Sequence, residues 1–392
     1  MRIAIAGAGI AGLAAATFLA RAGHEVTVFD QFAQPRPVGS GLMVQPVGLA
    51  VLKMLGLDQE LILRASRVNR IYGETSRGLP VLDVAYADLR SELCGYGVQR
   101  SVLFDLLLGS AVEAGAALEV STRVQSVSEA NTERRSLQTD AGAVGPFDLI
   151  VDALGSYSPL CPKPSAPLAF GALWALLDWV DVETLHSDRL EQRYEHAAKM
   201  VGLLPVGQSQ PGSAKKLTFF WSLRAVDQAE WQARSIEDWK AEVRTLWPAT
   251  DAVLDQITSH DDLTFAQYTH RTLRRPYGKG MVHIGDSFHA TSPQLGQGAN
   301  MALLDAAALH AAIQDVPIDR IGPHFASLRR MHVQLFQGAS WLFTPLYQSD
   351  SRVLPWIRDH LGAPVAALRP MRRLLAMLVA GELGAPLRRI SG

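Results

Sequence analysis

The sequence predicts an α/β protein, α+β overall, in which a domain of βαβ units carries an inserted, mostly antiparallel β-sheet and is followed by C-terminal helices. Residues 2–30 read as strand, helix and strand, which is one βαβ unit of ordinary length. Between residues 165 and 270, glycine-rich βα turns are missing, and apolar stretches rich in aromatic residues indicate the strands of the inserted sheet. From residue 305 onward the pattern is mainly helical, interrupted by prolines at 345, 355, 364 and 370.

The composition describes a globular protein of 392 residues, with 48% hydrophobic and 19% charged residues. The net charge of −1 provides no overall attraction to nucleic acid or to an acidic membrane. Cys94 and Cys161 are the only cysteines and lack CxxC or metal-ligand spacing, so we expect a reduced intracellular protein without a metal site. Glycines interrupt the apolar N-terminal stretch, and no apolar run reaches the roughly 18 residues of a membrane-spanning helix. The sequence therefore predicts a soluble, cytoplasmic protein.

A glycine-rich turn connects the first predicted strand to the first predicted helix. In the stretch GAGIAG, Gly7 permits a tight turn, Gly9 lets the backbone approach a pyrophosphate, and Gly12 lets helix and strand pack closely. Asp30 ends the next strand, where a carboxylate accepts hydrogen bonds from ribose and disfavours a 2′-phosphate. FAD or NAD therefore fits better than NADP, and this motif does not decide between the two. The residues expected at this Rossmann-like site are Gly7, Gly9, Ile10, Ala11, Gly12, Asp30 and Gln31.

A second unusual connection spans residues 284–309, IGDSFHATSPQLGQGANMALLDAAAL, between an apolar strand and a long helix. Asp286, which looks buried from its neighbours, can hydrogen-bond a sugar or ribitol hydroxyl. The small residues of LGQGAN turn backbone N–H groups toward a ligand at the start of the helix, where the helix dipole favours negative charge. Reduced flavin carries negative charge at its N1–C2=O locus, so this connection favours FAD.

Several segments together resemble the class A flavoprotein monooxygenases of the para-hydroxybenzoate hydroxylase type. These segments are the glycine turn with Asp30, PVGSGLMVQPVGLAVLKMLGL (37–57), RSVLFDLLL (100–108), GDSFHATSPQLGQGANMALLDA (285–306) and TPLYQSDSRVLPWIRD (344–359). The resemblance extends over most of the chain, and the GD motif followed by PxxGQGxN is highly specific. The resemblance implies that Asp286 binds the FAD ribitol, and that Arg100 lies near the phosphate and ribitol. The further FAD-site residues that it implies are Gly41, Pro293 on the substrate side of the flavin, Gly296, Gly298, Ala299 and Asn300.

The resemblance also implies a reaction and a division of the chain. NADH or NADPH reduces FAD, O₂ adds at flavin C4a, and the C4a-(hydro)peroxyflavin hydroxylates or epoxidises a small aromatic or polycyclic molecule. No catalytic side chain is required, because the chemistry is centred on the flavin. The FAD-binding domain is expected in residues 1–70, 98–164 and 271–345, the substrate domain in residues 71–97 and 165–270, and the C-terminal helices in residues 346–392.

One departure from the family pattern concerns the DG motif, which serves FAD and nicotinamide binding. The chain reads Asp152-Ala153-Leu154-Gly155-Ser156, so that Leu154 occupies the position of the aspartate. Leucine accepts no hydrogen bond, and Asp152 replaces the acceptor only if the register changes. Two alternatives therefore stay open: an FAD-dependent reductase or oxidase, or a monooxygenase that receives reduced flavin from an external flavin reductase. A non-catalytic flavin-binding relic is a third reading, against which the intact GQGAN stretch argues.

Candidate substrate contacts come from the inserted sheet, because aromatic walls suit a flat, apolar molecule. They are Trp174, Phe220, Trp221 and Tyr268, with Tyr72 and His196 as polar candidates. Alternating residues of a strand face opposite sides, so packing of the sheet on its helices is the simpler explanation for each one singly. His283 and His289 are expected to be structural. The arginine-rich C-terminal tail could contact a membrane or partner, although a terminal helix docked on its own domain is the preferred reading.

Overall fold

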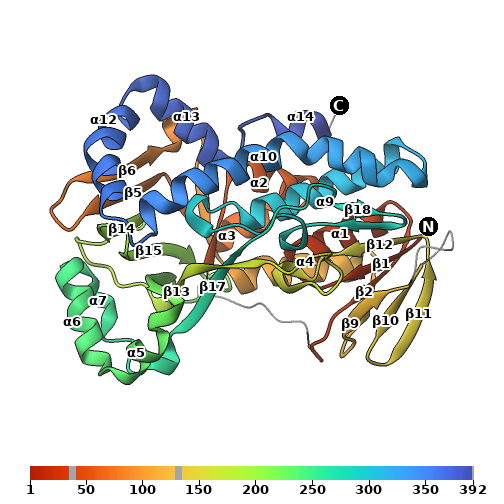
Figure 1. Ribbon diagram of the computed structural model, residues 1–392, viewed down its shortest axis with the longest axis horizontal. Helices are drawn as coiled ribbons and strands as arrows, with labels where there is room; N and C mark the ends of the chain where they lie inside the picture. The colour runs from red at the N-terminus through yellow and green to blue at the C-terminus, as the bar shows by residue number, and fades with distance from the viewer. Residues whose placement is uncertain (35–40, 129–134, 391–392) are drawn as a thin grey trace.

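A computed structural model describes residues 1–34, 41–128 and 135–390 and confirms the mixed α/β architecture (Figure 1). Residues 37–40 of the segment that resembles the family lie outside the described residues. A six-stranded sheet has the order β18-β19-β12-β1-β2-β8, in which β18 is antiparallel and the other strands are parallel. Its strands are β1 (Arg2–Ala6), β2 (Glu25–Phe29), β8 (Ala117–Glu119), β12 (Leu149–Asp152), β18 (Tyr277–Gly278) and β19 (Met281–His283).

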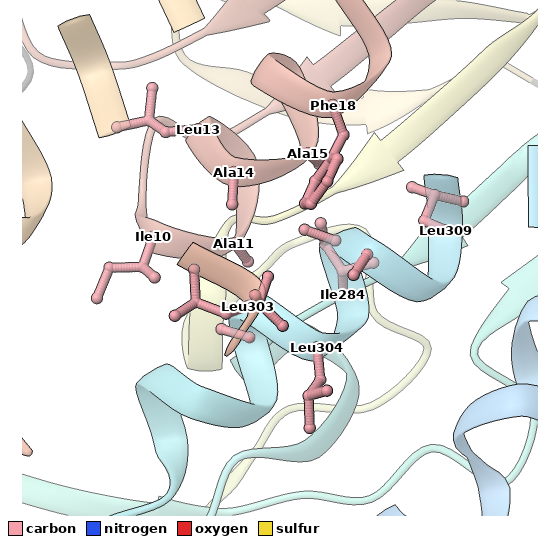
Figure 2. Close-up of a cluster of buried hydrophobic side chains, with 14 of the residues drawn as sticks. Ile10, Ala11, Leu13, Ala14, Ala15, Phe18, Ile284, Leu303, Leu304 and Leu309 are labelled. Carbon is pink, nitrogen blue, oxygen red and sulfur yellow. The ribbon is translucent and has the colours of Figure 1, made fainter. Parts of the chain in front are cut away.

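Helices α1 (Ile10–Arg21) and α9 (Gly298–Asp315) follow the two unusual connections and pack against each other. Figure 2 shows why they approach closely: Ala11, Ala14 and Ala15 of α1 are small, and Leu303 and Leu304 of α9 belong to the same buried cluster. Helices α2 (Pro46–Met54), α3 (Asp58–Arg64) and α4 (Arg100–Glu113) contribute further residues to this core. The two predicted ligand-facing helix starts are therefore fixed relative to each other by one hydrophobic core.

A seven-stranded sheet forms the inserted part, with the order β17-β13-β16-β15-β14-β5-β6. All neighbouring strands are antiparallel except β14 and β5, which run parallel, so the expected mostly antiparallel sheet is confirmed. Its strands are β5 (Arg70–Thr75), β6 (Pro80–Ala85), β13 (Ala166–Asp178), β14 (Arg189–Glu195), β15 (Lys199–Gly207), β16 (Lys216–Arg224) and β17 (Thr264–His270). Helices α5 (Gln228–Ala233), α6 (Ile236–Leu246) and α7 (Asp251–Leu254) cover one face.

Two three-stranded sheets complete the β structure. One contains β9 (Val124–Val127), β10 (Arg135–Thr139) and β11 (Gly142–Phe147). The other has β7 (Gly95–Gln99) between β3 (Gly41–Val44) and β4 (Ser66–Val68). A Cβ at Gly97 would lie 1.9 Å from the Pro205 carbonyl oxygen, and one at Gly41 would lie 2.3 Å from Thr218 Oγ1. These glycines let the small sheet pack directly against the seven-stranded one.

The C-terminal part is helical, as expected. Helix α10 (Ile321–Tyr347) is followed by α11 (Val353–Ile357), a π turn over Arg358–Gly362, α12 (Ala363–Ala366), α13 (Arg369–Ala380) and α14 (Pro386–Ile390). Helices α12 and α13 lie at one end of the molecule, above β5 and β6 and far from the N-terminus (Figure 1). No helix among the described residues combines the length and apolar content needed to cross a membrane.

Candidate active site

The first helix start has the geometry that its glycines predict. Gly7 has φ +107°, and a Cβ there would lie 2.5 Å from the Ala153 carbonyl oxygen. A Cβ at Gly12 would lie 2.0 Å from the Gly7 carbonyl oxygen, so the turn requires glycine at both positions. At Gly9 a Cβ would meet no described atom within 4 Å, and the N-terminus of α1 has no side-chain cap among the described residues. Gly9 therefore borders open space at a helix start whose backbone N–H groups no described side chain caps, as an anion-binding turn requires.

Asp30 follows β2 and braces this turn. Its Oδ2 accepts from the Ala8 N–H at 3.0 Å, and its Oδ1 accepts from the Phe32 N–H at 2.9 Å. Each carboxylate oxygen can accept a further bond, so the bracing is compatible with a ribose contact. The next residue, Gln31, is exposed.

Asp286 is the first residue of α8 (Asp286–His289) and is exposed, although every other residue from Val282 to Ala290 is buried. The expectation of a buried Asp286 was therefore wrong. The positive φ of Gly285, +62°, turns the chain sharply here, and Ser156 Oγ donates to Asp286 Oδ2 at 3.5 Å. Arg100, at the start of α4, faces the same space: desolvation lowers the pKa of its accessible guanidinium, and the charge of Asp286 opposes this shift. Asp286 thus follows a glycine that lies between α1 and α9, since a Cβ at Gly285 would be 2.9 Å from Ala11 Cβ and 3.7 Å from Ala302 Cβ. Arg100 lies near enough to interact with Asp286.

A buried ionic cluster fixes the backbone at Gly285. Asp305 Oδ2 accepts from the Gly285 N–H at 2.7 Å and lies 2.6 Å from His289 Nε2, while its Oδ1 accepts from Arg329 Nε at 2.7 Å. Burial alone would raise the pKa of Asp305, but His289 and Arg329 lower it below its ordinary value. His289 is a structural residue in this cluster, as expected. The cluster holds the turn that exposes Asp286.

The second helix start, at α9, is braced by Asn300. The Asn300 Oδ1 accepts from the Gln45 N–H at 2.8 Å, and its Nδ2 donates to the carbonyl oxygens of Met43 and Gly296 at 3.1 and 3.0 Å. Gly296 has φ +59°, and no described side chain caps the N-terminus of α9. A Cβ at Gly298 would meet no described atom within 4 Å. Open backbone N–H groups therefore recur here, and the Asn300 side chain locks the loop onto β3.

The backbone N–H groups at the starts of α1 and α9 fit a dinucleotide that carries a second, electron-rich ring system. Comparison with known proteins agrees with a dinucleotide site. Residues 1–317 match the family described as FAD binding domain. The chain belongs to this family and is a class A flavoprotein monooxygenase.

Relatives with known names support this assignment. The chain is 28% identical over 337 residues to 3-amino-4-hydroxybenzoate 2-monooxygenase from Streptomyces cremeus, covering 81% of this chain and 79% of that protein. It is 28% identical over 331 residues to the FAD-dependent urate hydroxylase of Klebsiella oxytoca, covering 79% of this chain and 80% of that protein. A crystal structure of 2-methyl-3-hydroxypyridine-5-carboxylic acid oxygenase has the same fold, with a TM-score of 0.80, 19% identity and coverage of 99% and 98%.

The altered DG motif of this flavoprotein is not repaired by Asp152. The Asp152 side chain is fully buried, and its Oδ2 accepts from Ser158 Oγ at 2.7 Å and lies 2.7 Å from His283 Nδ1. Its Oδ1 accepts from the Leu154 N–H at 3.1 Å, while the Leu154 side chain packs against an apolar cluster. A register change that would turn Asp152 toward the cofactor is therefore not observed. His283 is held in this network, in agreement with its expected structural role.

Cys161 joins this network and brings together residues far apart in the sequence. Ligand atoms of Asp152, Cys161 and His283 lie within 4.8 Å of one another, and Arg271 Nη1 lies 2.7 Å from the Cys161 sulfur. Desolvation and the Asp152 charge raise the pKa of Cys161 to about 11, against the opposing effect of Arg271. The thiol is therefore protonated at neutral pH, and the group acts as a hydrogen-bond network. Spacing along the sequence could not reveal it.

The structure divides the candidate substrate residues into separate groups. Trp174 and Phe220 lie on one face of the seven-stranded sheet, with ring centroids 5.2 Å apart. Strand alternation places Tyr268 on the same face, where burial raises the pKa of its hydroxyl well above the ordinary value and Trp174 opposes this shift. These three residues form an aromatic wall opposite the helices α5 to α7, in which Trp174 and Tyr268 are partly exposed and Phe220 is buried.

Trp221, Tyr72 and His196 do not join this aromatic wall. Trp221 is 3% exposed and contacts Trp239 edge to face at 6.2 Å on the helix-covered side of the sheet. The Tyr72 hydroxyl donates to Glu74 Oε2 at 2.9 Å on that same side. His196 is exposed in the β14–β15 turn with φ +56°. Packing, rather than contact with a ligand, accounts for the first two.

Sequence reasoning missed a polar link beside Pro293. Pro293 itself is exposed at the start of a 3₁₀ turn. The neighbouring Gln294 donates through Nε2 to Gln348 Oε1 at 3.3 Å, and Gln348 Nε2 donates to the Gly171 carbonyl oxygen at 3.3 Å. This link joins the flavin-side loop to β13 of the substrate sheet. Gln294 and Gln348 both lie inside segments that carry the family resemblance, but nothing in the sequence indicated that their side chains meet.

Proposed function

We propose that this flavoprotein monooxygenase hydroxylates a small aromatic molecule held between the aromatic wall and the loop of Pro293. The main support is that the starts of α1 and α9, whose backbone N–H groups have no side-chain cap within the described ranges, lie close to Asp286. Arg100 lies near Asp286 as well. The relatives named for 3-amino-4-hydroxybenzoate and urate support a flat, aromatic substrate. The cytoplasm is the proposed location, with O₂ as co-substrate.

The described residues fit FAD in the following roles. Gly9, Ile10 and Ala11 bind the pyrophosphate through backbone N–H groups, and Asp30 accepts from the adenosine ribose. Asp286 accepts from ribitol hydroxyls, and Arg100 lies beside the phosphates. The start of α9 stabilises negative charge on the ring system.

When bound, FAD supplies the electron transfer and the O₂ chemistry. The chain orients the substrate against the aromatic wall and excludes water there. The Tyr268 hydroxyl, whose pKa burial raises, stays protonated at neutral pH and can donate a hydrogen bond to a polar group of the substrate. The proposed FAD-binding part comprises residues 1–70, 98–164 and 271–345, the substrate part comprises residues 71–97 and 165–270, and residues 346–392 are the C-terminal helices.

Anaerobic stopped-flow spectroscopy tests this function. Purified protein is mixed with NADH or NADPH and a panel of small aromatic compounds, and flavin bleaching is recorded before ¹⁸O₂ is admitted. We expect bleaching and a product that carries one ¹⁸O atom by mass spectrometry. If the flavin reoxidises with hydrogen peroxide as the sole product for every compound, the oxidase alternative replaces the monooxygenase.

Leu154 favours a second candidate, in which an external reductase supplies the reduced flavin. The apolar Leu154 side chain and the fully engaged Asp152 leave no acceptor at the DG position. The substitution Leu154→Asp is then expected to increase the rate of bleaching by NADH or NADPH, with Leu154→Asn as the control of equal size. An unchanged rate for both variants, together with fast reduction of the unaltered protein, would exclude the external reductant.

A further inference from the structure

The helical segment that follows α10 exposes an unusual row of apolar side chains, which we call the apolar stripe. From Val353 to Val365 its members recur at helical spacing of one, three or four residues across α11, the π turn and α12, so they lie on one side of the segment, and Leu368 is exposed just beyond the end of α12. The stripe consists of Val353, Trp356, Ile357, Leu361, Val365 and Leu368, which are 65%, 54%, 37%, 56%, 48% and 58% exposed. Near the end of α10, Trp341 is 75% and Leu342 is 58% exposed.

The opposite side of this segment is anchored by a buried cation. Arg358 is 3% exposed and donates through Nη1 to the carbonyl oxygens of His196 and Leu346, both at 3.1 Å. Its guanidinium lies over the rings of Tyr194 and Tyr347, each at 5.1 Å. A surface helix of a globular domain ordinarily buries apolar residues and exposes charged ones. Here an arginine is buried and apolar side chains are exposed, and the contacts of Arg358 hold the segment in this orientation.

Charge at this end of the molecule differs from the rest. Residues 351–373 contain five arginines and one acidic residue, although the whole chain has a net charge of −1. Arg352 precedes the stripe, and Arg369 and Arg373 follow it; all three are exposed. Among the described residues none of the three has a carboxylate at ion-pairing distance, whereas Arg372 is paired with Asp88 at 2.6 Å. The apolar stripe is therefore flanked by arginines with unused positive charge.

We propose that the apolar stripe and its flanking arginines dock on the surface of an anionic lipid bilayer. Tryptophan and aliphatic side chains enter the boundary between headgroups and acyl chains, while Arg352, Arg369 and Arg373 contact anionic headgroups. The segment lies in the plane of the interface and does not cross the bilayer. A symmetric contact with a second copy of the chain would bring the same arginines of both chains together. Repulsion between these like charges disfavours a second copy as the partner of the stripe.

Vesicle cosedimentation of the full-length protein tests the proposal. We expect binding to vesicles of phosphatidylcholine with 30% phosphatidylglycerol, and at least tenfold weaker binding to phosphatidylcholine alone. The double substitution Trp356→Ser/Leu361→Ser and the charge reversal Arg369→Glu/Arg373→Glu should each weaken binding to the anionic vesicles at least tenfold. These side chains are exposed, so the flavin spectrum and Tm are expected to stay unchanged.

Matched controls alter equally exposed residues elsewhere. Val226, which is 74% exposed, is changed to Ser, and the exposed Lys53 and Lys279 are changed to Glu. Both controls should bind vesicles as the unaltered protein does. Absence of vesicle binding would overturn the proposal, as would binding that the stripe and arginine variants leave unchanged. If light scattering instead shows a dimer that Trp356→Ser/Leu361→Ser dissociates, a second copy covers the stripe and the lipid proposal is wrong.

Discussion

At Gly9 and Gly298 the chain borders open space at two helix starts that no described side chain caps, whereas Trp174 and Phe220 are aromatic side chains of neighbouring strands. The proposed nucleotide site at the two helix starts depends on close backbone packing, in which an added methyl group is disruptive. The proposed substrate site at the seven-stranded sheet depends on which face of a strand a side chain occupies. Substitutions at the two sites should therefore fail in different ways.

The largest effect on stability is expected for Trp221, which faces the helix-covered side of the seven-stranded sheet, whereas Trp174 faces the other side. Trp221→Ala removes a side chain that is 3% exposed and packed on Trp239, so we expect a loss of about 3–5 kcal/mol of stability. Trp174→Ala should change kcat and KM for the substrate while changing Tm much less. Thermal unfolding and steady-state kinetics measure both. Equal losses of stability in the two variants would contradict the assignment of separate faces.

The glycine turn offers a matched pair on the nucleotide side. Gly12→Ala places a Cβ 2.0 Å from the Gly7 carbonyl oxygen, so it should destabilise the fold by about 1–3 kcal/mol and abolish FAD binding. Gly9→Ala meets no described atom within 4 Å, so it should keep the Tm of the apoprotein and weaken FAD binding at least about tenfold. Gly109→Ala, in an open position within α4, is the control. If Gly9→Ala binds FAD normally, the pyrophosphate does not approach this backbone.

Asp286 tests the carboxylate between the two helix starts. Because a hydrogen bond to a charged group contributes about 1.5–3 kcal/mol, Asp286→Ala should weaken FAD binding about tenfold to a hundredfold. The side chain is exposed, so Tm of the apoprotein should not fall. Asp105→Ala, which removes an exposed acid from α4, should leave FAD affinity unchanged. Flavin fluorescence titration decides, and equal affinities for both variants would remove Asp286 from the site.

The smallest effect is expected for the pH dependence of stability, through the buried His332 next to Arg329. Burial, with the nearby Arg329 charge, lowers the pKa of His332 to about 3, whereas an unfolded histidine titrates near about 6.5. Below pH 6.5 the unfolded chain binds a proton that the folded chain does not, so stability falls with decreasing pH, by at most about 1.4 kcal/mol per unit. His332→Gln should flatten this slope in urea unfolding between pH 7 and pH 5. An unaltered slope would mean that folded His332 is protonated.

The nucleotide side could be predicted because its signals are local. Glycine spacing after a strand dictates the turn at Gly7 to Gly12, and the same reasoning located the start of α9. Exposure of Asp286 could not be predicted, since it depends on the turn at Gly285 and on Asp305, Arg329 and His289 behind it. For the aromatic residues the face was undetermined, because it follows from strand register. Likewise, the commitment of Asp152 to Ser158 and His283 depends on tertiary contacts.

Titration of the flavin-free protein with FAD, followed by fluorescence, tests whether the two helix starts and Asp286 bind FAD. We expect saturation at one FAD per chain, with weaker binding in Gly9→Ala and Asp286→Ala and unchanged binding in Gly109→Ala and Asp105→Ala. If the folded protein takes up no FAD, or if all four variants bind FAD with the same affinity, these residues do not form the FAD site.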